Sequence, residues 1–224
     1  ERRKLGVHIY DKLFHYVSSH KDLLPSLTIE SKLPSNHYPL SDYKNKNCVS
    51  RSIFFLKEYI FLFFKARNIK IIEIDSLEKF ISNHDLKLNV NYIIRKNIAQ
   101  YYVWYKFLKK RPKIKFLFIT VSYTNFGLIK ACKELNILVI EIQHGVINSE
   151  HYGYNYFYNP IENQFPDYIL TLGEGDTNFF DLTTLRKIVS VKSVGSFVID
   201  YFIENHKSNS NLLKKVTISL QDCE

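Results

Sequence analysis

The chain has 224 residues, of which 46% are hydrophobic and 15% aromatic, and its formal net charge is +9. This much apolar material suffices for one sizeable domain, and the scarcity of Gly and Pro excludes a disordered or low-complexity chain. The positive charge indicates either a solvated basic surface or a partner that carries negative charge.

The first part of the chain has no clear periodicity, and we expect residues 1–49 to be an irregular or helical segment. From residue 50 onward the pattern becomes regular and predicts four elements. These are helices over 50–68, 76–84 and 89–111 and a β-branched strand over 69–74.

Strands alternate with helices most clearly after residue 114, which predicts an α/β fold with a Rossmann-like, doubly wound parallel sheet. Ligands bind such sheets at the carboxyl ends of the strands. The predicted strands are 115–121, 137–143, 167–172 and 189–194, and the predicted helices are 125–136, 176–187 and 196–206.

The alternation of strands and helices stops near the end of the chain, where a polar linker is followed by the strand-like run 212–221. We expect residues 50–206 to form one domain. Residues 207–224 are expected to be a linker and the first strand of a second, largely missing domain.

Two segments bear on membranes. The apolar run 53–64 is too short and too charged to span a bilayer, and it predicts a buried helix or, less favoured, one lying on a membrane surface. The second segment is a basic cluster made of Lys106, Lys109, Lys110, Arg111, Lys113 and Lys115. No nucleic-acid-binding signature accompanies this cluster, so an anionic membrane or a phosphorylated substrate is favoured over nucleic acid as its partner.

The three cysteines lie far apart, which indicates neither a disulfide framework nor a metal site. A reducing compartment is the simplest inference, and no signal peptide is visible. We therefore expect a cytoplasmic protein, held at the inner membrane face by the basic cluster.

The predicted strand 137–143 ends in a polar run, in the order Gln143, His144 and Gly145. A neutral imidazole is suited to take a proton near neutral pH, so His144 is the candidate general base, and Gly145 lets a ligand approach the backbone. The alternative for His144 is a histidine that merely closes the sheet edge. Glu141 either assists the imidazole or has a structural role, pairing with a lysine or capping a helix.

The loop after His144 contains a second histidine, His151, which is either a binding group or an ordinary loop residue. Four tyrosines alternate over residues 152–158 and predict either an edge strand or packed loop, or a surface for stacking sugars. Ser122 and Tyr123 end a neighbouring strand and are expected to line the same cleft. The segment 173–176 lacks a phosphate-loop pattern, and Asp176 is the expected N-cap of the next helix.

These elements in this order resemble bacterial capsular and lipopolysaccharide glycosyltransferases of the GT-B type. A more distant similarity is to glycerophosphotransferases of teichoic acid synthesis, in which a His-Gly at an equivalent strand end is thought to act as the base. The matching residues are Ser122, Tyr123, Glu141, Gln143, His144, Gly145, His151, Gly153, Tyr154, Gly173, Glu174, Val194 and Gly195.

The resemblance implies two Rossmann-like domains, with the acceptor on the N-terminal one and the nucleotide-sugar donor on the C-terminal one. It implies transfer of a sugar to a saccharide or lipid-linked acceptor in surface polysaccharide synthesis, without a metal or other cofactor. The catalytic residues would be His144 and Glu141, and the substrate-binding residues Gln143, Gly145, His151, Tyr154, Ser122 and Tyr123. The alternative function is a non-catalytic saccharide-binding or regulatory domain.

Overall fold

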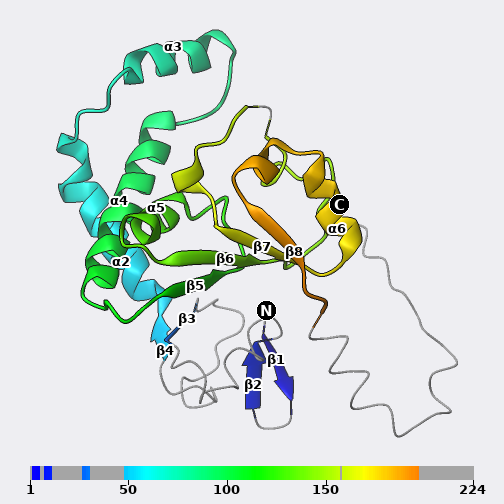
Figure 1. Cartoon of the computed structure of the whole chain (residues 1–224). Helices are drawn as coiled ribbons and strands as arrows, with labels where there is room; N and C mark the ends of the chain where they lie inside the picture. The colour runs from blue at the N-terminus through cyan, green and yellow to red at the C-terminus, as the bar shows by residue number, and fades with distance from the viewer. Residues whose placement is uncertain (1, 6–7, 12–26, 31–47, 157, 197–224) are drawn as a thin grey trace, which may run out of the picture.

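A four-stranded parallel sheet forms the centre of the protein (Figure 1). The computed structural model describes residues 2–5, 8–11, 27–30, 48–156 and 158–196. The strands are β5 (Phe116–Ile119), β6 (Leu138–Ile142), β7 (Tyr168–Thr171) and β8 (Ser190–Ser193), hydrogen-bonded in that order. All four predicted strands are confirmed, and so is the α/β class.

The sheet is covered by helices on one face in the described part of the chain. Helix α5 (Phe126–Glu134) connects β5 to β6, and α6 (Glu174–Asp181) connects β7 to β8. Because the strand order is monotonic and parallel crossovers are right-handed, both helices fall on the same side. Alternate strand residues such as Val139 are buried beneath them, whereas Phe116 and Leu138 on the other face are 45% and 42% exposed. The double winding stays a prediction.

Three longer helices precede the sheet. They are α2 (Arg51–Phe64), α3 (Ile74–Asn83) and α4 (Val90–Lys109), and a short 3-10 turn, η2 (Ala66–Asn68), follows α2. Side-chain caps fix two of the starts: Ser50 accepts a hydrogen bond from the Ser52 amide, and Asn89 accepts one from the Tyr92 amide. The three predicted helices are therefore confirmed.

Helix α2 is attached to α4 by a small set of contacts. The Phe54 ring stacks on Trp104 with centroids 4.1 Å apart, and the Trp104 indole donates to Glu58 at 3.1 Å. Phe54 and Glu58 are the buried residues of α2, while Phe55 and Phe64 are 53% and 67% exposed. The prediction of a buried helix is therefore wrong for most of its surface.

The predicted strand 69–74 is also wrong. It is a turn that leads into α3, with Ile72 82% exposed and Glu73 in the left-handed conformation at φ 60°. β-branched residues favour a strand only where a neighbouring strand pairs with them and buries one face. No strand pairs with this segment among the described residues.

The helix after β7 begins earlier than expected. Its N-cap is Gly173 and not Asp176, which lies within the first turn. The helix ends at Asp181 and is followed by a 3-10 turn, η4 (Thr184–Lys187), so the predicted single helix 176–187 is divided. A third 3-10 turn, η3 (Glu162–Gln164), precedes β7.

The described parts of the first 50 residues are short strands. β1 (Arg2–Leu5) and β2 (His8–Asp11) are antiparallel, and β3 (Thr28–Glu30) pairs in parallel with β4 (Cys48–Ser50). The predicted helix 196–206, the linker and the strand 212–221 lie outside the described residues. Within the described residues, no helix combines the length and the apolar character needed to cross a bilayer.

Helices α4 and α5 approach each other closely at Gly127. A Cβ atom there would lie 2.4 Å from the Asn97 carbonyl oxygen and 2.6 Å from the Tyr101 backbone nitrogen. The buried Gln100 side chain fills the remaining space and accepts hydrogen bonds from the amides of Gly127 and Leu128, at the start of α5. This contact fixes the helix that follows the end of β5.

Gly127→Ala is expected to destabilise the protein by about 1–3 kcal/mol, because the added methyl group meets backbone atoms that cannot rotate away. Urea unfolding measures the effect. Gly145→Ala is the matched control, since a Cβ at Gly145 meets nothing within 4 Å. Equal stability of the two variants would contradict the close approach.

Candidate functional site at the carboxyl ends of the strands

Polar side chains gather where β5 and β6 end. Ser122 follows β5 and is buried, and Gln143 follows β6 and is also buried. His144 comes next and is partly buried, whereas Gly145 is exposed. The parallel register places Ile119 beside Glu141, so both strand ends meet at one edge of the sheet. The structure thus brings together the residues that the sequence places on separate strands.

Glu141 is the centre of a buried hydrogen-bond network. Its Oε1 atom accepts from the Tyr154 hydroxyl at 2.6 Å and from the Ser122 amide at 3.3 Å. Its Oε2 atom is buried with no hydrogen-bond partner among the described residues. The carboxyl group thereby ties the end of β5 to the loop that follows β6.

Burial changes the acidity of this network. Desolvation raises the pKa of Glu141 to about 7, although the hydrogen bonds from Tyr154 and Ser122 lower it. The pKa of Tyr154 is raised as well, first by burial and then by the neighbouring Glu141 carboxylate. Glu141 therefore titrates near neutral pH, where acid–base chemistry operates.

Gln143 joins the ends of β6 and β7. Its Oε1 atom accepts from the Leu172 amide at 2.8 Å, and its Nε2 group donates to the Gly145 carbonyl at 2.8 Å. Both ends of the side-chain amide are engaged within the protein. In this arrangement Gln143 shapes the turn that carries His144.

His144 lies on that turn, one residue past the buried part of the strand. The adjacent Gly145 has open space around the position of a Cβ atom. Among the described residues, no neighbour therefore requires a glycine at this position. The arrangement leaves open space beside His144, a partly buried residue whose Nδ1 atom is buried.

The loop after Gly145 is packed by aromatic rings. The His151 ring lies 4.7 Å from the Tyr154 ring and 5.5 Å from the Tyr123 ring, measured between centroids. Its Nδ1 atom accepts a hydrogen bond from the Gly153 amide at 3.2 Å. A neutral imidazole that accepts at Nδ1 carries its proton on Nε2.

Gly153 is required by this packing. A Cβ atom there would lie 2.3–2.7 Å from three ring carbons of Tyr123. Tyr123 is itself held by edge-to-face contacts with Tyr152 and Tyr154. The glycine in the motif therefore has a structural reason, which the sequence alone does not reveal.

The alternating tyrosines form a packed loop and not a strand. Tyr154 is buried, and the hydroxyl of Tyr156 donates to the Gly153 carbonyl at 2.9 Å. Tyr152 and Tyr158 are exposed. The alternation thus separates inward rings, which hold the loop, from outward rings that are free to meet a ligand.

Sequence reasoning places Tyr154 on the wall of the cleft and misses that it holds Glu141. One signal was available, because an acidic residue in a buried strand requires a hydrogen-bond donor nearby. Which donor supplies it depends on how the loop folds back over 13 residues.

Tyr154→Phe is expected to destabilise the protein by about 1–3 kcal/mol, because the buried Glu141 carboxylate loses its shortest hydrogen bond. The loss should be larger above neutral pH, where Glu141 is ionised. Urea unfolding at two pH values measures it, with Tyr152→Phe on an exposed tyrosine as the control. Unchanged stability at both pH values would contradict the role of the bond.

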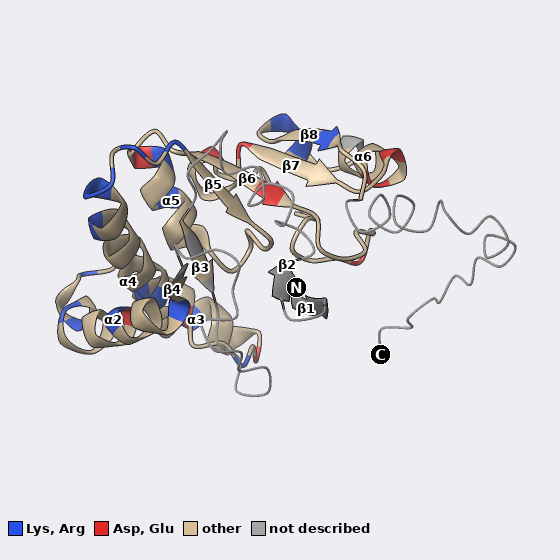
Figure 2. Cartoon of the chain, turned by 90° about the horizontal axis from the view of Figure 1, so that it is seen from below, with Lys and Arg blue, Asp and Glu red and all other residues tan. Residues whose placement is uncertain are grey.

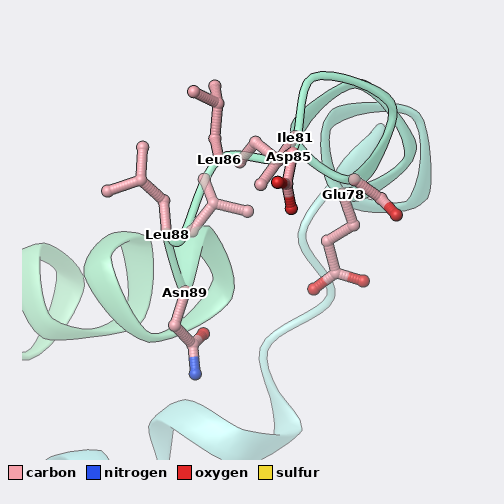
Figure 3. Close-up of a pocket in the computed structure, with 8 residues that line it drawn as sticks. Glu78, Ile81, Asp85, Leu86, Leu88 and Asn89 are labelled. Carbon is pink, nitrogen blue, oxygen red and sulfur yellow. The ribbon is translucent and has the colours of Figure 1, made fainter.

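Two cavities lie away from this edge. One has a volume of about 520 Å³ and lies between α3 and the start of α4. Glu78, Asp85 and Asn89 contribute separate polar side chains to its lining, and Leu88 points away from Asn89 (Figure 3). The other, named here the α2–α4 groove, has a volume of about 560 Å³. It is lined by Phe54, Lys57, Ile60, Phe61, Phe64, Lys65, Tyr102, Val103, Lys106, Phe107, Lys110 and Arg111.

Metal and phosphate binding find little support at the strand ends. No cluster of three His, Cys, Asp or Glu residues that would hold a metal ion occurs among the residues that the structure describes. Glu174 and Asp176 occupy the first turn of α6 and already complement the positive end of the helix dipole. Their negative charge disfavours a phosphate at this helix end.

Comparison of the chain with protein-family models, with curated proteins and with solved structures found no match.

Proposed function

We propose that this protein is a glycosyltransferase, or the acceptor-binding part of one, of the GT-B type. It transfers a sugar from a nucleotide-sugar donor to a saccharide or lipid-linked acceptor in bacterial surface polysaccharide synthesis. The observation that carries the proposal is the partly exposed His144 beside the open Gly145, at the carboxyl ends of parallel strands. Such ends are the usual ligand site of α/β sheets.

In the proposed reaction, His144 accepts one proton. The acceptor hydroxyl attacks the anomeric carbon of the donor and gives its proton to the imidazole. A glycosidic C–O bond forms while the bond between the anomeric carbon and the nucleotide phosphate oxygen breaks. The electron pair leaves with the nucleotide, so no metal or cofactor is needed to balance the step.

The buried residues support this chemistry indirectly. Gln143 holds the turn that carries His144 through bonds to Leu172 and Gly145. Glu141 and Tyr154 hold the following loop over the end of β5. A base fixed in place loses less freedom when the acceptor binds, which favours catalysis. Glu141 acts in this proposal as a positioning residue.

The acceptor is expected to lie against the exposed residues of the loop. Tyr152 is exposed beside Tyr123 and His151, and an aromatic face suits the apolar face of a sugar ring. The donor is expected on a second domain that faces this edge. The acidic first turn of α6 agrees with a donor phosphate placed elsewhere.

The cellular location belongs to the same proposal. We expect a cytoplasmic protein at the inner face of the membrane, where a lipid-linked acceptor is presented. The basic residues at the end of α4 supply the attraction to anionic lipid (Figure 2).

The experiment is an acceptor-dependent assay of nucleotide release, with a panel of nucleotide-sugars and the full-length protein. Release that rises with added saccharide or lipid-linked acceptor supports transfer. His144→Ala should lower this release, and His84→Ala is the matched control, because His84 is an exposed histidine at the end of α3. Saccharide binding without any nucleotide release would favour a non-catalytic binding domain instead.

A further inference from the structure

The α2–α4 groove is the most apolar cavity described for this protein, and it lies apart from the strand ends. Its floor is made of rings that are already stacked: Phe54 on Trp104, and Phe61 on Tyr102 with centroids 5.0 Å apart. Ile60 and Val103 add aliphatic surface beside them. The volume of about 560 Å³ is in the usual range for binding sites of small organic ligands.

The rim of the groove is basic. Five of its twelve lining residues are Lys or Arg and none is acidic. Lys57, Lys65, Lys106 and Lys110 are exposed, so their ammonium groups are accessible. Arg111 is held in place, because its guanidinium lies 3.7 Å from the centroid of the Phe107 ring and donates to the Phe107 carbonyl.

The surroundings of the groove are apolar as well. Helix α2 exposes several large apolar side chains, which is unusual for a protein surface that faces only water. Lys57 and Lys65 extend from the same helix, and Figure 2 shows basic residues along α2 and at the end of α4. The exposed apolar residues of α2 are Ile53, Phe55, Leu56, Tyr59, Ile60, Phe63 and Phe64.

We propose that the α2–α4 groove binds an anionic membrane lipid, with an acyl chain on the aromatic floor and the headgroup at the lysines. The charge of the rim selects a negative headgroup. An apolar chain matches the floor, whereas a nucleic acid would need free ring faces on which to stack its bases. Phe54 and Phe61 already use one face each within the protein.

The single tryptophan of the chain provides the test. Trp104 is 2% exposed and lies directly beneath Phe54, which lines the groove. A bromine atom quenches tryptophan fluorescence only at close range. The probe is lysophosphatidylglycerol with a brominated acyl chain, added to the full-length protein below the micellar concentration of the lipid.

Saturable quenching of Trp104 by this probe is the expected result. Brominated lysophosphatidylcholine, which has no net charge, should bind about tenfold or more weakly, the effect of losing a contact to a charged group. Inorganic phosphate should not compete at equal concentration, because it lacks the chain. Absence of quenching, or equal binding of the two lipids, would overturn the proposal.

Two pairs of substitutions locate the headgroup. Lys57→Gln with Lys106→Gln removes two charges from the rim and should weaken binding about tenfold or more. Lys113→Gln with Lys115→Gln removes the same charge outside the groove and should change binding little, since salt screens distant charges. Equal weakening by both pairs would mean a diffuse attraction and overturn the site.

A second copy of the chain is the competing occupant. In this case, sedimentation without lipid would show self-association of the protein, and Phe64→Glu would abolish that self-association. This outcome would also overturn the proposal. Lipid binding is measured by the fluorescence of Trp104 and not by turnover. The lipid site and the proposed transferase activity can therefore fail separately.

Discussion

Replacing His144 with alanine should lower turnover of the full-length enzyme by about 100- to 10,000-fold, the usual range for the loss of a general base. The imidazole is the group proposed to take the acceptor proton, on a turn next to the open Gly145. Affinity for the nucleotide-sugar should barely change, because the donor is proposed to bind the other domain. Steady-state kinetics and donor binding measure the two quantities.

Two controls separate catalysis from folding in this experiment. The variant must unfold cooperatively at a temperature close to that of the unaltered protein. Added imidazole should restore part of the activity of His144→Ala, since it replaces the missing base, whereas His84→Ala should stay near full activity. Near-normal turnover of His144→Ala would leave His144 as a residue that only closes the sheet edge.

Replacing Glu141 with glutamine should remove a loss of stability that the unaltered protein shows as pH rises. The pKa of Glu141 is raised by burial from its ordinary value of 4.5 to about 7. In the unfolded chain the carboxyl group ionises at its ordinary pKa, so between these values the folded state holds the proton more tightly. Stability therefore falls with rising pH.

The size of this effect follows from the pKa change. One pKa unit corresponds to about 1.4 kcal/mol, so ionised Glu141 costs the folded state about 3 kcal/mol above neutral pH. This cost is absent below the ordinary pKa of Glu141, because the carboxyl group is then protonated in both the folded and the unfolded state. Glutamine has a similar shape and no charge at any pH, so it should make the variant the more stable protein under alkaline conditions.

Urea unfolding of both proteins from about pH 4 to pH 8 provides the measurement. Glu58 is a second carboxyl group whose pKa burial raises, and it contributes a slope of the same sign to both proteins. The difference between the two profiles therefore isolates Glu141. Parallel profiles would show that Glu141 keeps an ordinary pKa in the folded protein.

The sequence determined the four strands β5 to β8 and the helix α5. Short apolar runs separated by amphipathic stretches predict β5 to β8 and α5 because both patterns depend on neighbours along the chain. Their parallel arrangement follows from the long crossover segments that separate consecutive strands. The position of His144 at a strand end is predictable for the same reason, since it depends only on where β6 ends.

Elements that depend on distant partners were not predictable. The run 69–74 has the composition of a strand, but no described strand pairs with it, so it becomes a turn. Helix α2 has the composition of a buried helix, yet among its residues only Phe54 and Glu58 are buried. Both results depend on how much surface the neighbouring elements supply, and no local pattern records that.

The candidate site also combines features that the sequence predicts with features that only the structure shows. The sequence by itself predicts His144, Gly145 and the aromatic loop as a candidate site, because residue types and their order suggest that chemistry. Only the tertiary structure decided that Tyr154 is buried on Glu141, 13 residues away, and that Gly153 faces the Tyr123 ring. These contacts arise where a loop folds back over a strand end. Their partners are set by packing in three dimensions, for which the sequence has no periodic signal.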